Sequence, residues 1–160
     1  MKNHKIVIDY CIYPSLENLN EEDQVLMNSA IGARRNAYAP YSNFYVGAAV
    51  LLENGAIVIG SNQENASYPS GLCAERVAIF QAGALYSGLT IKAVAITATS
   101  KNYIVKQAAA PCGNCRQAMI EYEQKQKKPI KILLMGEQGE VIQFNSLLDI
   151  LPLAFNNSFL

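Results

Sequence analysis

Two apolar, β-rich runs, residues 46–52 and 56–61, flank the dipeptide Asn54-Gly55. Asn-Gly between such runs is a strong signal for a β-hairpin, because both residues tolerate the positive φ angles of a two-residue turn. The strands of a hairpin are antiparallel, so a sheet that contains them cannot be purely parallel. This constraint narrows the folds that are open to the rest of the chain.

Outside the hairpin, helical and strand-like segments alternate along the chain. Helical periodicity predicts helices over residues 21–38, 73–84, 111–125 and 146–151. Apolar alternation or continuous apolar runs predict further strands over residues 4–13, 91–99, 130–135 and 141–144. Helices interleaved with strands are typical of a sheet covered by helices. We therefore expect an α/β fold with three layers, α/β/α, around a mixed, mainly five-stranded sheet.

The length of 160 residues suits one ordinary domain, and neither an internal repeat nor a linker divides the chain. Residues 1–20 precede the first predicted helix, and we interpret them as an N-terminal extension with an added strand. Residues 21–160 are interpreted as the main domain, in which the loop 100–110 has no assigned role.

Charge and hydropathy argue against two classes of partner. Lysine plus arginine and aspartate plus glutamate each number 13, so the chain lacks the basic surplus of proteins that track phosphate backbones. No stretch has the ~18 apolar residues that span a bilayer, and the N-terminus lacks a signal-peptide pattern. We therefore expect a cytoplasmic protein that binds neither nucleic acid nor membrane. Thiols stay reduced in the cytoplasm, so metal binding or redox chemistry explains the four cysteines better than disulfides do.

Three of the cysteines fall at predicted helix starts: Cys73 in the run Cys-Ala-Glu-Arg, and Cys112 and Cys115 in Pro-Cys-Gly-Asn-Cys-Arg-Gln. Helix N-termini carry partial positive charge and unpaired N–H groups, which favour the thiolate that a metal needs. Cys112 and Cys115 are three residues apart, so a helix presents them on one stripe. The pattern predicts a metal site at the ends of two helices.

A Cys-x-x-Cys pair alone leaves a redox pair and half of a structural zinc site open as alternatives. Redox chemistry explains neither Cys73 nor the glutamate two residues after it. A structural four-cysteine site would need Cys11, which is isolated on the N-terminal segment, and the only histidine, His4, lies near the terminus. Three thiolates without a fourth protein ligand are typical of an open, catalytic zinc site with room for water.

Glu75 lies in the same predicted helical turn as Cys73. Zinc in an open site lowers the pKa of water, and hydrolysis also needs a group that moves protons between water and substrate. Glu75 is placed for that task. For Cys-Ala-Glu by itself, the alternatives are that Glu75 is an ordinary first-turn glutamate or a further metal ligand. Both alternatives explain the sequence much less well once Pro-Cys-Gly-Asn-Cys follows downstream.

Together these motifs resemble the zinc deaminases, in which one ligand, a glutamate two residues later and a Pro-Cys-x-x-Cys run occur in this order. More closely, the chain resembles the free-nucleoside cytidine deaminases of the small, homotetrameric type. The resemblance runs from about Glu21 to Phe155 and includes residues 38–49, 62–68 and 151–155. It implies the cytidine deaminase-like fold and zinc-dependent hydrolytic deamination of free cytidine and deoxycytidine in pyrimidine salvage, with one Zn²⁺ per subunit.

The resemblance implies that Cys73, Cys112 and Cys115 bind zinc and that Glu75 is the proton shuttle. Arg76 matches an arginine that donates hydrogen bonds to the thiolates. That role has an independent reason, because three thiolates around Zn²⁺ leave a net negative charge that a guanidinium and two helix N-termini offset. An ordinary surface arginine is the alternative.

For substrate binding, the resemblance implies that the Ala74 N–H holds the pyrimidine and that Phe44 packs on the base or sugar. Asn62 and Glu64 would hydrogen-bond the ribose 3′-hydroxyl. Phe155 would reach the pyrimidine of a neighbouring chain in a homotetramer with shared active sites, unless it merely closes the core of its own subunit. A contact to the 3′-hydroxyl tolerates both cytidine and deoxycytidine.

Three rival functions differ from this interpretation at particular residues. Deaminases of nucleoside antibiotics of the blasticidin type share both cysteine motifs but diverge where this chain has residues 62–68. Polynucleotide-editing deaminases typically have histidine in place of Cys73 and a basic surface. A catalytically inactive zinc-binding or scaffold protein does not explain the retention of Glu75 and of the pair Asn62 and Glu64.

Overall fold

The hairpin predicted around Asn54-Gly55 is present in the computed structural model, which describes residues 1–160. Strand β2 (Phe44–Leu52) pairs antiparallel with β3 (Ile57–Ser61). Gly55 has a φ angle of +84° in the turn between them, a conformation that glycine adopts without steric cost. The local signal was therefore sufficient to position these two strands.

The hairpin forms one end of a six-stranded sheet with the order β1-β6-β5-β4-β2-β3. The remaining strands are β1 (Cys11–Tyr13), β4 (Ile91–Ser100), β5 (Lys131–Met135) and β6 (Val141–Phe144). Only β4 and β5 are parallel, and every other pair is antiparallel. The mixed sheet was predicted correctly, and it has six strands rather than five because β1 adds an edge strand.

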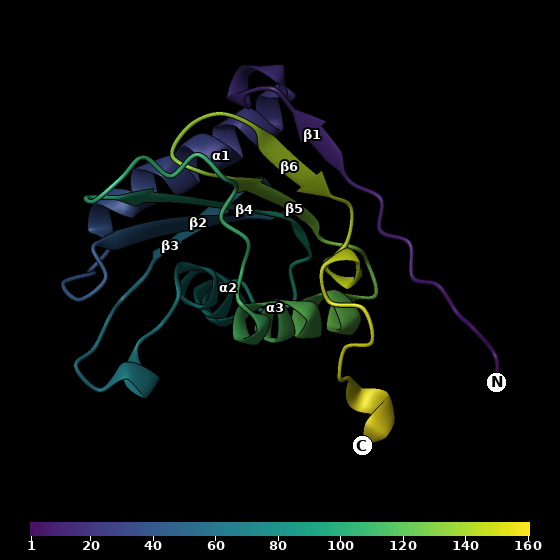
Figure 1. The fold of residues 1–160 in the computed structure, drawn as a ribbon. Coiled ribbons are helices and arrows are strands. Elements are labelled where there is room, and N and C mark those ends of the chain that lie inside the picture. Colours follow the sequence, from purple (N-terminus) through teal and green to yellow (C-terminus); the bar gives the residue numbers. More distant parts are fainter.

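Helices cover both faces of this sheet (Figure 1). Helix α1 (Glu21–Ala33) packs on one face, and α2 (Ala74–Leu85) and α3 (Gly113–Gln126) lie side by side on the other. Successive side chains of β2 point to opposite faces of the sheet, so Val50 packs toward α2 and α3 while Ala49 packs toward α1. The three-layer α/β/α architecture is confirmed.

Gly47 allows α1 to approach the sheet closely. A Cβ atom on this residue would stand 2.0 Å from the carbonyl oxygen of Ala30, so only glycine fits between β2 and α1. At the other end of α1, the side chain of the N-cap residue Asn20 accepts a hydrogen bond from the N–H of Asp23, at 2.9 Å. These contacts fix α1 against the sheet and leave the opposite face to α2 and α3.

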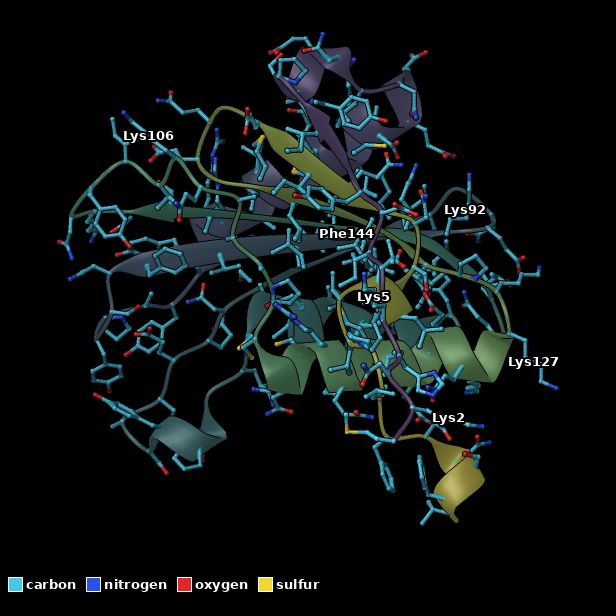
Figure 2. The ribbon with its side chains drawn as sticks, turned by 45° about the vertical axis from the view of Figure 1, so that its right-hand side comes forward. Lys2, Lys5, Lys92, Lys106, Lys127 and Phe144 are labelled. Carbon is cyan, nitrogen blue, oxygen red and sulfur yellow. The ribbon has the colours of Figure 1, made fainter.

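The N-terminal extension contains much less strand than the alternation over residues 4–13 predicted. Within the extension only β1 joins the sheet, through β6, which is four residues long, so residues 1–10 find no further strand to pair with. The Tyr10 ring lies 5.5 Å from the ring of Phe144. Figure 2 shows the segment that carries Lys2 and Lys5 continuing past Phe144 and away from the sheet.

Helix ends also differ from the prediction. The first helix ends at Ala33, is followed by a 3₁₀ turn at Arg34–Asn36, and does not reach residue 38, because Tyr38 forms a β-bridge with Gln63. The short final helix predicted over residues 146–151 is a single 3₁₀ turn, Leu147–Asp149. No helix in the structure combines the length and the apolar character needed to cross a membrane.

Candidate active site

The N-termini of α2 and α3 meet at the three cysteines that the sequence singled out. Cys73 is the N-cap residue of α2, Cys112 is the N-cap residue of α3, and Cys115 lies in the first turn of α3. Their sulfur atoms all lie within 4.8 Å of one another. The helix starts were predicted from local sequence, and the packing of α2 beside α3 brings the three thiols together.

The environment of the cluster favours a thiolate. Hydrogen bonding from the Cys115 thiol is the main cause that lowers the pKa of Cys73 to about 5, against the opposing effect of burial, and Arg76 contributes in the same direction. The same hydrogen bond raises the pKa of Cys115, which is fully buried. The cluster thus favours a thiolate at Cys73, the state that a metal ligand needs.

This donor set fits zinc. Three sulfur ligands at short mutual distance, of which one ionises readily, suit an ion that binds thiolates at about 2.3 Å in a tetrahedral arrangement. No histidine, aspartate or glutamate completes the group as a fourth ligand. The cluster therefore matches an open site, in which the fourth position is available to water or substrate.

Glu75 is buried in the first turn of α2, with 5% of its surface exposed. Burial raises the pKa of this carboxyl above its ordinary value, and the negative charge of Cys73 acts in the same direction. Hydrogen bonding to the backbone of Glu75 itself, and to a smaller extent the Cys115 thiol, partly opposes this rise of the pKa. A buried carboxyl group beside a metal site is suited to general acid–base chemistry.

Arg76 also faces the cluster. Burial acts to lower the pKa of its guanidinium, but the neighbouring thiols of Cys73 and Cys115 raise it. Its Nη2 donates to the carbonyl oxygen of Gly71 at 3.3 Å. This position agrees with the electrostatic argument made from the sequence, since a fixed cation offsets the charge of the thiolates. Charge balance by Arg76 stays a prediction.

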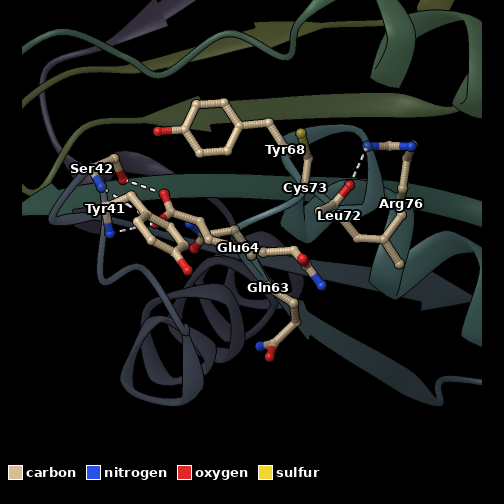
Figure 3. A pocket seen from close by; sticks show the side chains of 11 residues that line it. Tyr41, Ser42, Gln63, Glu64, Tyr68, Leu72, Cys73 and Arg76 are labelled. Atoms are coloured by element: carbon tan, nitrogen blue, oxygen red, sulfur yellow. Dashed lines mark hydrogen bonds between the residues drawn. The ribbon is translucent and has the colours of Figure 1, made fainter.

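A cavity of about 440 Å³ opens beside the cluster (Figure 3). Its walls are formed by the loop before β2, the segment after β3 and the start of α2. The lining residues are Tyr41, Ser42, Asn62, Gln63, Glu64, Asn65, Tyr68, Gly71, Leu72, Cys73 and Arg76. The volume falls within the usual range of small-molecule sites, and its walls supply both aromatic and polar groups.

Asn62 is held at the end of β3 by two hydrogen bonds of its side-chain amide. The Val46 N–H donates to Oδ1 at 2.8 Å, and Nδ2 donates to the carbonyl oxygen of Phe44 at 2.9 Å. Each of these amide atoms can form one more hydrogen bond. The side chain is therefore rigid and still has one donor and one acceptor position for a ligand.

The remaining predicted site residues are placed differently with respect to the cavity. Phe44 and Ala74 do not line it but adjoin residues that do, Phe44 through its carbonyl group and Ala74 as the neighbour of Cys73. Phe155 is 57% exposed, its carbonyl oxygen accepts from Gln117 at 3.0 Å, and it is not part of the cavity of its own chain. Its ring stacks on that of Phe159, with the centroids 5.4 Å apart.

Seven cavity residues were not singled out from the sequence, among them Tyr41, Ser42 and Tyr68. The rings of Tyr41 and Tyr68 lie 5.9 Å apart and form one wall. The signal for Ser42 was the run Ala-Pro-Tyr-Ser-Asn, which was included only in the resemblance over residues 38–49. Its contact to Glu64 joins segments that are 22 residues apart, and no local pattern reports such a contact.

Comparison with known proteins agrees with this geometry. Residues 20–128, more than half of the chain, match the family model of the cytidine and deoxycytidylate deaminase zinc-binding region. The chain is also 42% identical over 132 residues to a cytidine deaminase from Halalkalibacterium halodurans, covering 82% of this chain and 92% of that protein. This chain belongs to the cytidine deaminase family.

Two solved structures of cytidine deaminases support the assignment. The enzyme from Burkholderia pseudomallei is 42% identical with a TM-score of 0.70, over 82% of this chain and 97% of that one. The enzyme from Mycobacterium tuberculosis is 32% identical with a TM-score of 0.63, over 82% of this chain and 95% of that one. The family match includes Glu75 and all three clustered cysteines, so zinc, one ion per subunit, is the cofactor that the cluster fits.

Proposed function

We propose that this chain hydrolyses the 4-amino group of free cytidine and deoxycytidine, giving uridine or deoxyuridine and ammonia. One observation carries the proposal: three thiols lie within 4.8 Å of one another at two helix N-termini, with the buried carboxyl group of Glu75 beside them. Family membership agrees with the proposal, since the matched relatives are named cytidine deaminases.

In the proposed site, Cys73, Cys112 and Cys115 bind zinc, and Arg76 balances the charge of the thiolates. Zinc, when bound there, lowers the pKa of water so that hydrolysis proceeds near neutral pH. Glu75 accepts a proton from the attacking water and passes it to N3 of the pyrimidine. The oxygen of this water adds to C4, and Glu75 then carries the second proton from the new C4 hydroxyl group to the amino group, which leaves as ammonia when its bond to C4 breaks. Burial suits Glu75 to this shuttle, because a raised pKa eases both acceptance and release of a proton near neutral pH.

The cavity beside the cluster receives the nucleoside. The Ala74 N–H at the start of α2 donates to the pyrimidine, and Phe44 packs on the base or sugar. Asn62 and Glu64, which line the same cavity as Cys73, hydrogen-bond the ribose 3′-hydroxyl. The free hydrogen-bonding positions on Asn62 support this role.

Four chains assemble in the proposed enzyme, and Phe155 stacks on the pyrimidine of a neighbouring chain. The side chain lies between the 3₁₀ turns Leu147–Asp149 and Asn157–Phe159, is 57% exposed and stands outside the cavity of its own subunit. An exposed aromatic ring near the end of the chain is in a position to cross to another copy. It does not close the core of its own subunit.

We place the reaction in the cytoplasm, in pyrimidine salvage, with the free nucleoside as substrate. All four cysteines are free thiols, as a reducing compartment requires. Polynucleotides are disfavoured as substrates by equal numbers of acidic and basic residues, 13 of each, since phosphate contacts demand a basic surface. The presence of cysteine rather than histidine at position 73 points in the same direction.

The loss of cytidine, followed by its ultraviolet absorbance, tests the proposal. Zinc-loaded protein should convert cytidine and deoxycytidine, a chelator should abolish turnover, and added zinc should restore it. Glu75→Gln should retain zinc and fold but lose at least roughly 10²–10⁴-fold in kcat, because an amide cannot shuttle protons. Turnover of Glu75→Gln within about 10-fold of the wild type would exclude the shuttle role.

A further inference from the structure

Glu64 is clamped by the loop that precedes β2. Its backbone is held by one hydrogen bond, in which the Glu64 N–H donates to the carbonyl oxygen of Tyr38 at 2.8 Å. Its carboxylate then accepts from the N–H groups of Tyr41 and Ser42, at 2.9 and 3.3 Å, and from the hydroxyl of Ser42. Figure 3 shows Tyr41 and Ser42 turned toward this carboxylate.

Ser42 is the member of this clamp that acts through its side chain. Its Oγ accepts a hydrogen bond from the Phe44 N–H at 3.0 Å, so the hydroxyl proton is directed toward Oε1 of Glu64. The hydroxyl therefore links the start of β2 to the carboxylate. Partial desolvation acts to raise the pKa of Glu64, but the bonds from Ser42 and Tyr41 together outweigh it and lower this pKa.

A carboxylate offers about four acceptor positions, and this clamp occupies three of them. One acceptor position remains on Oε1, the oxygen that Ser42 contacts, in a side chain that lines the cavity beside Cys73. A ligand hydroxyl that donates to Oε1 therefore meets an ionised, oriented acceptor. We propose that Ser42 is a positioning residue that orients the Glu64 carboxylate for the sugar 3′-hydroxyl and so sets the selectivity for nucleosides that carry it.

This inference rests on the proposed function. It assigns the selectivity for the sugar to Ser42, in addition to Asn62 and Glu64, which contact the sugar directly in the proposed site. Loss of the Ser42 hydroxyl leaves Glu64 with two backbone donors to Oε2 and a carboxylate free to turn. Hydrogen bonds to charged groups contribute strongly, so Ser42→Ala should lower kcat/KM for cytidine about 10-fold, mainly through KM. For 3′-deoxycytidine, which lacks the hydroxyl, the change should stay below about 2-fold.

Two further variants separate positioning from folding. Ser42→Thr keeps a hydroxyl and should restore kcat/KM for cytidine to within about 3-fold of the wild type. In a Glu64→Ala background, Ser42→Ala should have less than a 2-fold further effect, because residues that act as one unit are not additive. Ser70→Ala is the matched control. Ser70 is exposed, its hydroxyl contacts only Ser67, and it does not line the cavity, so cytidine kinetics should not change.

A binding experiment keeps this inference distinct from the proposed function. In zinc-loaded Glu75→Gln protein, calorimetry measures the dissociation constants of cytidine and 3′-deoxycytidine with and without the additional Ser42→Ala change. A preference for cytidine that falls about 10-fold with Ser42→Ala supports the inference even if the wild type proves to turn over neither nucleoside. A preference that is unchanged by Ser42→Ala, or absent from the parent protein, overturns it.

Discussion

Gly60 in β3 lies so close to Ala74 in α2 that a Cβ atom on Gly60 would stand 2.5 Å from the Ala74 carbonyl oxygen. The same added atom would also stand 2.5 Å from the N–H nitrogen of Ala78. Strand and helix backbones therefore touch directly at the turn that carries Cys73 and Glu75. The position of Cys73 at the start of α2 therefore depends on the absence of a side chain at Gly60 in β3.

Gly60→Ala should therefore push α2 outward. The overpacking should lower the free energy of unfolding by ~1–3 kcal/mol, and the shift of Cys73 should weaken zinc binding. Urea denaturation and a competitive zinc titration measure the two effects. Gly32→Ala is the control, because an added Cβ at this exposed helical position meets no atom within 4 Å. It should stabilise α1 by up to ~1 kcal/mol and leave zinc affinity unchanged. Equal zinc affinity in both variants would contradict the role of Gly60.

Cys112→Ser should reduce the zinc content well below one ion per subunit and lower stability, because metal binding contributes to the free energy of folding. Elemental analysis and thermal unfolding measure the two quantities. Cys11→Ser is the matched control, since Cys11 is exposed on β1 and outside the metal cluster. It should keep full zinc. Full zinc content in Cys112→Ser would remove this residue from the set of ligands.

Glu64→Ala should lower kcat/KM for cytidine far more than for free cytosine, which has no sugar. Asn62→Ala should have the same selective effect and also destabilise the fold by ~1–2 kcal/mol, because the Val46 N–H and the Phe44 carbonyl lose their partner. Steady-state kinetics with both substrates and urea denaturation test this distinction. Glu140→Ala serves as the control, since Glu140 is exposed. It should change neither the kinetics with the two substrates nor the free energy of unfolding. Equal losses for cytidine and cytosine would rule out the sugar role.

Phe155 is predicted to act on a neighbouring subunit, where stacking on the base contributes on the order of 1–3 kcal/mol. Refolding inactive Glu75→Gln chains together with weakened Phe155→Ala chains creates mixed sites that have an intact Glu75 and a neighbour's intact Phe155. Activity per competent subunit should then exceed that of Phe155→Ala alone. Native mass spectrometry verifies that mixed tetramers have formed. If they have formed and activity does not recover, Phe155 does not act across the interface.

Features set by a few neighbouring residues could be predicted from the sequence. Asn54-Gly55 specified its own turn, and the helix starts at Cys73 and Cys112 followed from short patterns. The family resemblance supplied the ligand set and the proton shuttle. These predictions needed no knowledge of which segments pack together, apart from the assumption that helices cover a mixed sheet.

Features that depend on a distant partner were missed or misjudged. The extent of the first strand is limited by the length of β6, which no pattern within residues 4–13 reveals. The first predicted helix ends early because Tyr38 pairs with Gln63 instead of continuing it. The hydrogen bond from Ser42 to Glu64 appears only when the loop before β2 closes over the end of β3.

The distribution of the three cysteines over two helices has a consequence for how the protein is made. Chains emerge from the ribosome N-terminus first, so Cys73 appears with α2 well before β4 and the start of α3 have been synthesised. A nascent chain that ends before Cys112 offers a single clustered thiol and cannot retain zinc there. Zinc loading must therefore follow the docking of α3, and every chain released by premature termination upstream of Cys112 is metal-free.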